Sequence, residues 1–85
     1  MTAQRREEAN QEALDRWAEL ACYNGATDAA VNDLLEEIAG EKYERYEDYE
    51  DPIWEIIRSL SDEELDEFID GCDYITGCLM VAIRP

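Results

Sequence analysis

The chain has 85 residues, 46% of them hydrophobic, so we expect one compact domain over residues 1–85 with a modest core. It carries 23 Asp and Glu against 7 Lys and Arg, has no His, and has a formal net charge of -16. This charge excludes direct binding to nucleic acid or to an anionic membrane through a basic patch, because phosphate groups would repel the surface. The lack of histidine removes the commonest acid–base catalyst and metal ligand.

The three cysteines, Cys22, Cys72 and Cys78, form an odd count without C-x-x-C spacing. This pattern fits neither a disulfide framework nor a zinc site, so we expect small core residues in a reducing cytoplasm. Polar residues follow Arg5-Arg6, and the longest apolar run, residues 78–83, is far short of a bilayer span. We therefore expect a bacterial cytoplasmic protein that is neither secreted nor embedded in a membrane.

Apolar residues recur three and four positions apart in the first half of the chain, which predicts two helices. The first covers residues 2–23, and Asn24-Gly25 is expected to end it as a left-handed stop signal. Thr27 is the expected N-cap of the second helix, and Gly40 ends its pattern. We expect the two helices to lie antiparallel across a short turn. The expected core residues are Ala9, Ala13, Leu14, Trp17, Leu20, Ala21, Val31, Leu34, Leu35 and Ile38.

An acidic segment and a strongly apolar segment follow. Residues 41–50 place Tyr43, Tyr46 and Tyr49 three apart, which predicts a short helix, with a loop or a single turn as the alternative. Asp51 and Pro52 then predict an N-cap and a proline in the first turn of a fourth helix. That helix is expected to bury Ile53, Trp54, Ile56, Ile57 and Leu60.

The last segment begins with a capping box at Ser61 to Glu64, which predicts a helix with Leu65, Phe68 and Ile69 facing inward. Beyond Gly71 and Gly77 the pattern allows a continued helix, a broken and restarted helix, or an extended strand at residues 78–83. We favour helix, with Ile75, Leu79 and Ala82 in register. The predicted fold class is all-α, a small bundle of four to five short helices.

The negative charge is unevenly distributed along the chain. Residues 61–73 carry seven acids and no base, and residues 41–51 carry six acids against two bases. The last twelve residues contain no acid. An acid-free apolar end predicts either a buried helix or a surface for homodimerisation.

Acids also recur at helical spacing, at Glu8, Glu12, Asp15 and Glu19 and again from Glu63 to Asp73. With a rise of about 1.5 Å per residue, such carboxylates lie about 4.5–6 Å apart along the axis, close to the spacing of successive phosphates on a nucleic-acid strand. A helical acidic stripe can therefore imitate a row of phosphates. The alternative is a solvated face, which suits first-turn acids because they complement the helix dipole.

Four acids argue against the interpretation that the acidic stripes are only a solvated face. They are Glu19, Glu36, Glu37 and Asp70. We expect them in the last turns of their helices, where a negative charge opposes the dipole by about 0.3–1 kcal/mol. We therefore favour an acidic binding surface.

Other chemistries have less support in the sequence. There is no histidine, phosphate-cradling glycine loop or activated nucleophile motif, so we expect a protein that is not an enzyme. The acidic segment lacks the residue order of a calcium loop, so we expect no metal site and no cofactor. Its tyrosines are either interface contacts or core residues, and the sequence leaves both open.

In size, charge and striped carboxylates the chain resembles the small acidic proteins that phages and mobile elements use against host defence, namely DNA-mimic antirestriction proteins and some anti-CRISPR proteins. The stripes that carry the resemblance are residues 8–19, 41–51 and 62–73. The resemblance implies an inhibitor that occupies the basic nucleic-acid channel of a restriction enzyme or CRISPR effector complex. These groups differ in fold, so no contact residue is carried over.

We thus expect competition, in which Lys and Arg of a basic nucleic-acid-binding protein meet carboxylates in place of phosphates and salt weakens the complex. Reversing Glu44, Glu47 and Asp48 is expected to reduce binding far more than reversing Glu8 and Glu12. The predicted partner-binding residues are Glu41, Tyr43, Glu44, Tyr46, Glu47, Asp48, Tyr49, Glu50, Asp51, Glu63, Asp66, Glu67, Asp70 and Asp73.

Two other classes of function share this composition. An acidic adaptor, antitoxin or chaperone-like module would bind a basic partner away from its nucleic-acid site. A structural protein would dimerise through the acid-free end and use its charge for solubility.

Overall fold

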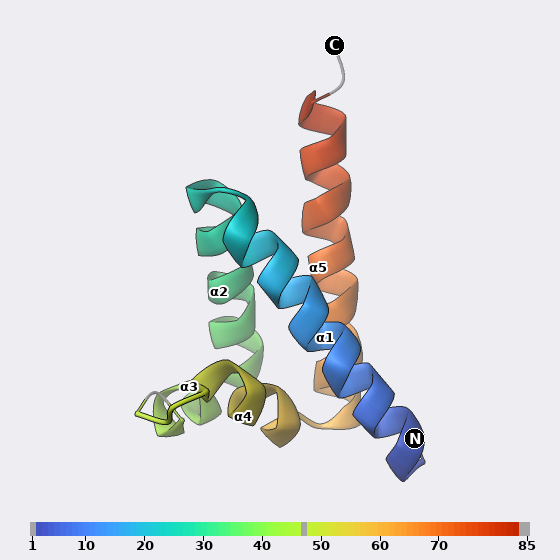
Figure 1. The fold of residues 1–85 in the computed structure, drawn as a ribbon, viewed down its shortest axis with the longest axis vertical. Coiled ribbons are helices and arrows are strands. Elements are labelled where there is room, and N and C mark those ends of the chain that lie inside the picture. The colour runs from blue at the N-terminus through green and yellow to red at the C-terminus, as the bar shows by residue number, and fades with distance from the viewer. Residues whose placement is uncertain (1, 47, 84–85) are drawn as a thin grey trace.

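Three long helices, α1 (Ala3–Tyr23), α2 (Gly25–Ala39) and α5 (Asp62–Ile83), pack against one another. Two short helices, α3 (Glu41–Arg45) and α4 (Pro52–Ser59), lie at the end of the bundle where α5 begins (Figure 1). The computed structural model describes the backbone of residues 2–46 and 48–83, and within these ranges the side chains as far as Cys78. The described chain contains helices and no strand, which confirms the all-α prediction.

Asn24 joins α1 to α2 and caps both. Its backbone is extended, its side-chain oxygen accepts from the Thr27 backbone N–H at 2.9 Å, and its own N–H donates to Thr27 Oγ1 at 3.2 Å. The predicted left-handed stop at Asn24-Gly25 is wrong, because this reciprocal cap reverses the chain without one. Thr27 is the third residue of α2 rather than its N-cap, and its buried hydroxyl donates to the Leu20 carbonyl at 2.6 Å.

Gly40 ends α2, as predicted. It has φ +56°, a conformation that favours glycine, and its N–H donates to the Glu36 carbonyl at 2.8 Å. The predicted helix over residues 41–50 is shorter than expected, because α3 ends at Arg45 and the described residues after it form turns. Closely spaced acids disfavour helix there, and Pro52 disfavours helical backbone at the residue before it.

The predicted starts of the last two helices are confirmed. Asp51 caps α4 by accepting from the Trp54 backbone N–H at 3.4 Å, with Pro52 as the first helical residue. Ser61 and Glu64 form both halves of the capping box of α5, at 3.1 and 2.8 Å. α5 then runs as one helix of 22 residues to Ile83, so residues 78–83 are helical. The predicted inward positions of Leu79 and Ala82 lie outside the described side chains.

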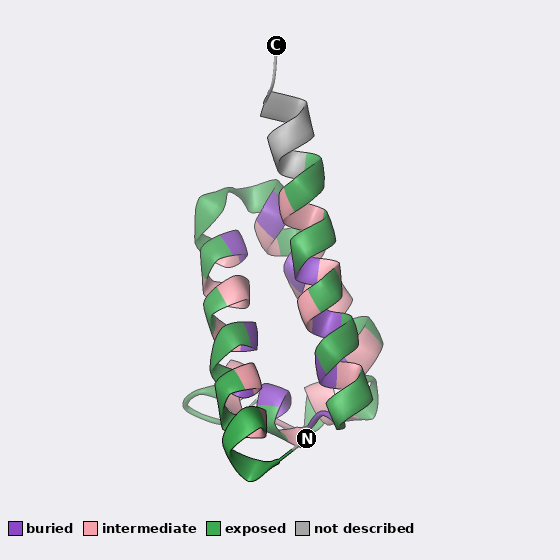
Figure 2. Ribbon diagram, turned by 90° about the vertical axis from the view of Figure 1, so that its right-hand side faces the viewer, coloured by how far each residue is buried: buried purple, intermediate pink, exposed green. Residues whose placement is uncertain are grey.

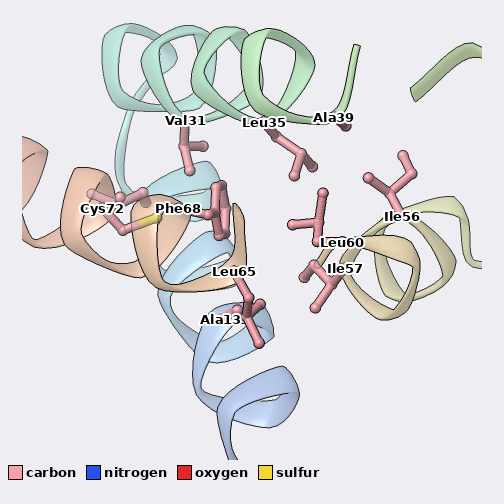
Figure 3. Packing of buried hydrophobic residues seen from close by; sticks show 11 residues of the cluster. Ala13, Val31, Leu35, Ala39, Ile56, Ile57, Leu60, Leu65, Phe68 and Cys72 are labelled. Atoms are coloured by element: carbon pink, nitrogen blue, oxygen red, sulfur yellow. The ribbon is translucent and has the colours of Figure 1, made fainter. Parts of the chain in front are cut away.

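The core lies between α1, α2, α4 and α5, and the buried positions face the interior of the bundle (Figure 2). Phe68 is completely buried near its centre, among side chains from all four helices (Figure 3). The buried hydrophobic residues are Ala13, Leu20, Val31, Leu35, Ala39, Ile56, Ile57, Leu60, Leu65, Phe68 and Cys72.

The prediction that all three cysteines are core residues holds for Cys72 alone. Cys22 and Cys78 are exposed, because each lies on a helix position that faces away from the other helices. None of the helices in the described part of the chain is both long and apolar enough to span a bilayer.

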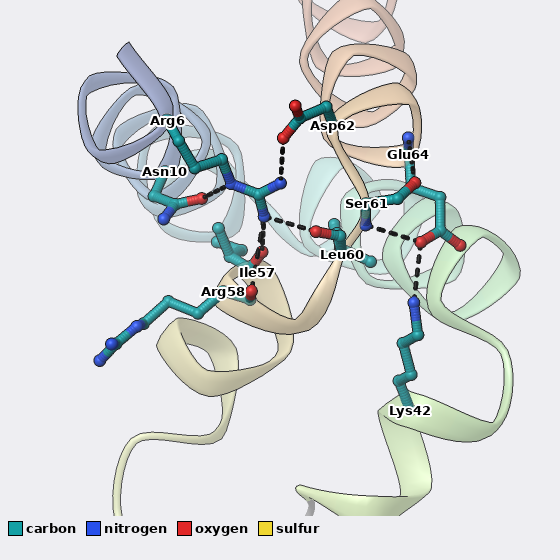
Figure 4. Close-up of polar contacts among 9 residues, drawn as sticks. All are labelled: Arg6, Asn10, Lys42, Ile57, Arg58, Leu60, Ser61, Asp62 and Glu64. Carbon is teal, nitrogen blue, oxygen red and sulfur yellow. Dashed lines mark hydrogen bonds and ion pairs between the residues drawn. The ribbon is translucent and has the colours of Figure 1, made fainter. Parts of the chain in front are cut away.

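Arg6 connects α1 to the junction between α4 and α5 (Figure 4). Its guanidinium lies 2.8 Å from both Asn10 Oδ1 and Asp62 Oδ1. Its Nη2 also donates to the carbonyl oxygens of Ile57 at 3.1 Å and Leu60 at 2.5 Å, near the end of α4. Arg6 therefore donates to carbonyls at the end of α4, where few intrahelical donors remain, and it fixes where α5 starts relative to α1.

Candidate functional site

Acids from α1 and α5 meet across a groove between these two helices. The groove has a volume of about 690 Å³. Glu8 and Glu12 line it from α1, and Asp66 and Asp70 line it from α5. Its other lining residues are Arg5, Ala9 and Ile69. Thus two acidic stripes that are far apart in the sequence form the two walls of one groove.

The packing of apolar residues explains this arrangement. Ala9 and Ile69 are partly buried against the core at the base of the groove, and the small side chain of Ala13 is buried where α1 approaches α5. In each helix the groove acids are four residues apart and lie beside the apolar stripe. Helical periodicity therefore places one pair of carboxylates on each side of the groove between α1 and α5.

The groove is poorly neutralised by bases of this chain. Among the described residues, no base lies within ion-pairing distance of Glu8, Asp66 or Asp70. Glu12 accepts from Arg16 Nη2 at a long 3.4 Å. Four acids and one base, Arg5, line this concave surface. Such an excess of one sign of charge concentrates the electrostatic potential, so this groove attracts cationic groups.

The predicted acids of α5 differ in their position relative to the groove. Asp66 and Asp70 line the groove, and Asp73 lies one turn further on, where its carboxylate is 3.2 Å from Arg16 Nε. Glu63 and Glu67 are exposed but do not line the groove. Because α5 continues to Ile83, Asp70 lies in its interior, and the prediction that Asp70 opposes the dipole in a last turn is wrong.

Glu8 and Glu12 are absent from the predicted partner-binding residues, although they form the α1 wall of the groove. Their spacing marks them as part of an acidic stripe in the sequence. The direction of that stripe depends on how α1 packs against α5, which no local pattern reveals.

In the central segment, the described acids are dispersed on the surface. Five of them are exposed: Glu41, Glu44, Asp48, Glu50 and Asp51. The carboxylate of Asp51 is engaged as the cap of α4. Glu47, which is also a predicted partner-binding residue, lies outside the described residues.

The three central tyrosines have different environments. Tyr43 and Tyr46 are half-buried and pack against the core, whereas Tyr49 is 55% exposed. The Tyr46 and Tyr49 rings lie 5.3 Å apart, centre to centre. Of the two alternatives for these residues, core packing describes Tyr43 and Tyr46, and only Tyr49 has a ring that is mainly accessible.

A second groove, between α1 and α4, has a different character. Arg6, Asn10, Trp54 and Arg58 are among its lining residues, and the Arg58 guanidinium lies 6.0 Å from the centre of the Trp54 ring. Arg58 makes no ion pair with a described acid. This groove therefore combines bases with an aromatic ring, whereas the groove between α1 and α5 is acidic.

Two carboxylates at the start of α5 are held in their charged form. The pKa of Asp62 is lowered, chiefly by its hydrogen bond with Arg6, and the pKa of Glu64 is lowered, chiefly by its hydrogen bond with Lys42 at 2.8 Å. Both groups stabilise the junction of the helices, so we assign them to the fold rather than to the groove.

The buried thiol of Cys72 is not a reactive nucleophile, and the described acids and thiols form no metal-binding cluster. Burial, together with the charge of Asp73, raises the pKa of the Cys72 thiol to about 12, which makes it unreactive. No group of three or more Cys, Asp or Glu side chains in the described part of the chain is arranged to hold a metal ion.

The acid-free end of the chain is described only in part. Ile75 is half-buried, and Tyr74, Gly77 and Cys78 are exposed on α5. The apolar side chains after Cys78, which carry the prediction of a dimer surface, lie outside the described residues.

Comparison with known proteins identifies no relative of this chain. The chain matches no protein-family model, no curated protein and no solved structure.

Proposed function

We propose that this protein is a non-catalytic inhibitor that presents a nucleic-acid-like row of carboxylates to a basic nucleic-acid-binding protein, such as a CRISPR effector complex or a restriction enzyme. The observation that carries the proposal is the groove between α1 and α5, where Glu8 and Glu12 face Asp66 and Asp70. Asp66 and Asp70 are among the predicted partner-binding residues, and Glu8 and Glu12 extend the inferred binding surface beyond them.

The groove suits this role because four carboxylates and a single base, Arg5, line it, and Glu12 is the one groove acid that forms an ion pair with a base among the described residues. Within each wall the carboxylates are four residues apart, or about 6 Å along the helix axis. Lysine and arginine side chains that normally contact successive phosphates can contact such carboxylates instead. The net charge of -16 accelerates association with a basic surface, and salt weakens it.

The first experiment is affinity capture of partners from nuclease-treated bacterial lysate at low and high salt, followed by mass spectrometry and competition with duplex DNA. Recovery of a nucleic-acid-handling protein that both salt and DNA displace is the expected result. A partner that stays bound at high salt and in excess DNA would contradict the mimic and favour an adaptor that binds elsewhere.

The contribution of the groove is then measured with two charge-matched double variants. Asp66→Asn with Asp70→Asn removes two groove carboxylates, and Asp33→Asn with Glu37→Gln removes two exposed, unpaired carboxylates of α2. We expect the groove variant to lose about tenfold in affinity for the captured partner, since each exposed charge pair contributes about 0.2–1 kcal/mol. Equal losses in both variants would show that net charge, rather than the groove, determines binding.

A further inference from the structure

The groove between α1 and α4 contains hydrogen-bond donors that no group in the described part of the chain uses. It has a volume of about 710 Å³ and shares no lining residue with the acidic groove. Two bases and one acid line it, although acids prevail in the chain as a whole. Its lining residues are Ala3, Arg6, Glu7, Asn10 and Gln11 from α1, and Trp54 and Arg58 from α4.

Asn10 is the buried polar residue of this groove. It is only 7% exposed, and its Oδ1 accepts from Arg6 Nε at 2.8 Å. Its Nδ2 has no acceptor among the described residues, although this atom is not closed to solvent. A buried amide donor without an acceptor is unfavourable. Asn10 therefore points to an acceptor that enters the groove from outside the chain.

Trp54 and Arg58 supply further donors from the opposite wall. The Arg58 guanidinium forms no ion pair with a described acid, and it lies 6.0 Å from the centre of the Trp54 ring, the outer limit of a cation–π contact. Figure 4 shows the Arg58 side chain extending away from Arg6. Trp54 Nε1 donates to no described residue, whereas Trp17 Nε1 donates to Asn32 Oδ1 at 3.0 Å. Both walls of the groove thus offer donors to the same space.

We propose that this groove binds a small organic carboxylate with a flat apolar part, such as an aromatic acid. The carboxylate accepts from the Arg58 guanidinium and the Asn10 amide, and the flat part lies beside the Trp54 ring. An ionised carboxylate accepts several hydrogen bonds on its two oxygens, and those from a guanidinium are among the strongest. The volume of the groove lies in the range of small-molecule sites. This inference is independent of the inhibitor proposal.

The charge of the ligand is limited in both directions. A cation is repelled by the unpaired guanidinium of Arg58. A multiply charged anion such as phosphate is repelled by Glu7 in the groove and by the net charge of -16. A single negative charge meets Arg58 with the least repulsion, so we expect a carboxylate to bind more tightly than inorganic phosphate.

Heteronuclear NMR with three small molecules tests the site: benzoate, benzamide and inorganic phosphate. An ionic strength of about 0.15 M screens the distant acids. The chain has two tryptophans, so the indole N–H of Trp17 is an internal reference for that of Trp54. Benzoate is expected to shift the Trp54 indole and Asn10 amide resonances saturably and to leave Trp17 in place. Benzamide, which has the same shape without the charge, and phosphate should bind more weakly.

Two charge-matched variants measure the contribution of Arg58. Arg58→Gln is expected to weaken benzoate binding about two- to fivefold, the range that exposed ion pairs give. Arg45→Gln removes the same charge from an exposed position of α3 outside the groove and should leave the affinity unchanged.

A third variant tests the buried amide. Asn10→Asp keeps an acceptor for Arg6 but removes both amide donors, so it should abolish benzoate binding. Thermal unfolding verifies that each variant is folded.

The outcomes decide between a site and nonspecific association. Saturable shifts that require both Arg58 and the carboxylate support the site. It is refuted if benzoate shifts Trp17 as much as Trp54, if benzamide or phosphate binds as tightly as benzoate, or if Arg58→Gln and Arg45→Gln behave alike. Because neither Arg58 nor Asn10 lines the acidic groove, these results leave the inhibitor proposal to its own experiments.

Discussion

Arg6 Nη1 on α1 lies 2.8 Å from the carboxylate of Asp62 in the first turn of α5, although the two residues are 56 positions apart in the chain. This contact fixes the first turn of α5 against α1. The position of α5 in turn decides which of its acids face α1. The groove between the two helices thus depends on an arginine that does not line it.

Replacing Arg6 is expected to destabilise the protein. Arg6→Gln removes the guanidinium that donates to the carbonyls of Ile57 and Leu60 and should lower the free energy of unfolding by about 1–3 kcal/mol. Arg5→Gln is the matched control, because it removes the same charge from an exposed neighbour and should change the free energy by less than about 0.5 kcal/mol. Urea denaturation measures both, and equal effects would contradict the structural role of Arg6.

The contact between Lys42 and Glu64 predicts a pH-dependent contribution to stability. Because the pKa of Glu64 is lowered from its ordinary 4.5 in the folded protein, its contribution is fully present above pH 4.5 and is lost as the pH falls through the lowered value. The melting temperature of Glu64→Gln should therefore lie below that of the wild type at pH 6–7, and the difference should shrink as the pH falls further below 4.5. Glu63→Gln removes an exposed neighbouring carboxylate without an ion pair, and its difference from the wild type should stay small. A Glu64→Gln difference that does not shrink with acid would contradict the assignment.

Two glycines of α5 should respond in opposite ways to alanine. A Cβ on Gly71 would lie 2.5 Å from Leu34 Cδ2, whereas a Cβ on Gly77 would meet no atom within 4 Å. Gly77→Ala should raise stability by about 0.5–1 kcal/mol through helix propensity. Gly71→Ala should be less stable than Gly77→Ala by about 1–3 kcal/mol, because Leu34 must move out of a packed contact. Thermal unfolding measures the difference, and Leu34→Ala should reduce it. Similar stabilities for both glycine variants would refute the close approach of α2 and α5.

The three thiols are expected to react at different rates. Cys22 and Cys78 are exposed, whereas burial raises the pKa of Cys72 to about 12 and shields its sulfur. At pH 8 an excess of a chromogenic disulfide reagent should modify Cys22 and Cys78 rapidly and Cys72 only after unfolding in urea. Peptide mass spectrometry identifies the labelled sites. Rapid labelling of Cys72 in the native protein would contradict its burial.

The helices were largely predictable because their boundaries depend on neighbouring residues. Gly40, Asp51, Pro52 and the capping box of Ser61 act within one turn, and each of them begins or ends a helix as predicted. The spacing of the tyrosines favours a helix over residues 41–50, with a loop or a single turn as the alternative, and the structure is helical only as far as Arg45.

The groove was less predictable than the helices. The sequence predicts Asp66 and Asp70 as partner-binding residues from their acidic stripe. It also places Glu8 and Glu12 in a stripe, but it assigns their reversal the smaller effect on binding. The difference between Asp66 and Glu67 illustrates the reason. Both are exposed acids at adjacent positions, and only the packing of α5 against α1 brings Asp66 into the groove.

The walls of the acidic groove come from the first and the last helix of the chain. Bringing such distant segments together costs more chain entropy than pairing α1 with α2, which share the cap at Asn24. A chain in which α5 has not packed against α1 therefore keeps its negative charge but lacks the groove. Recognition by this groove would report that these two helices have come together.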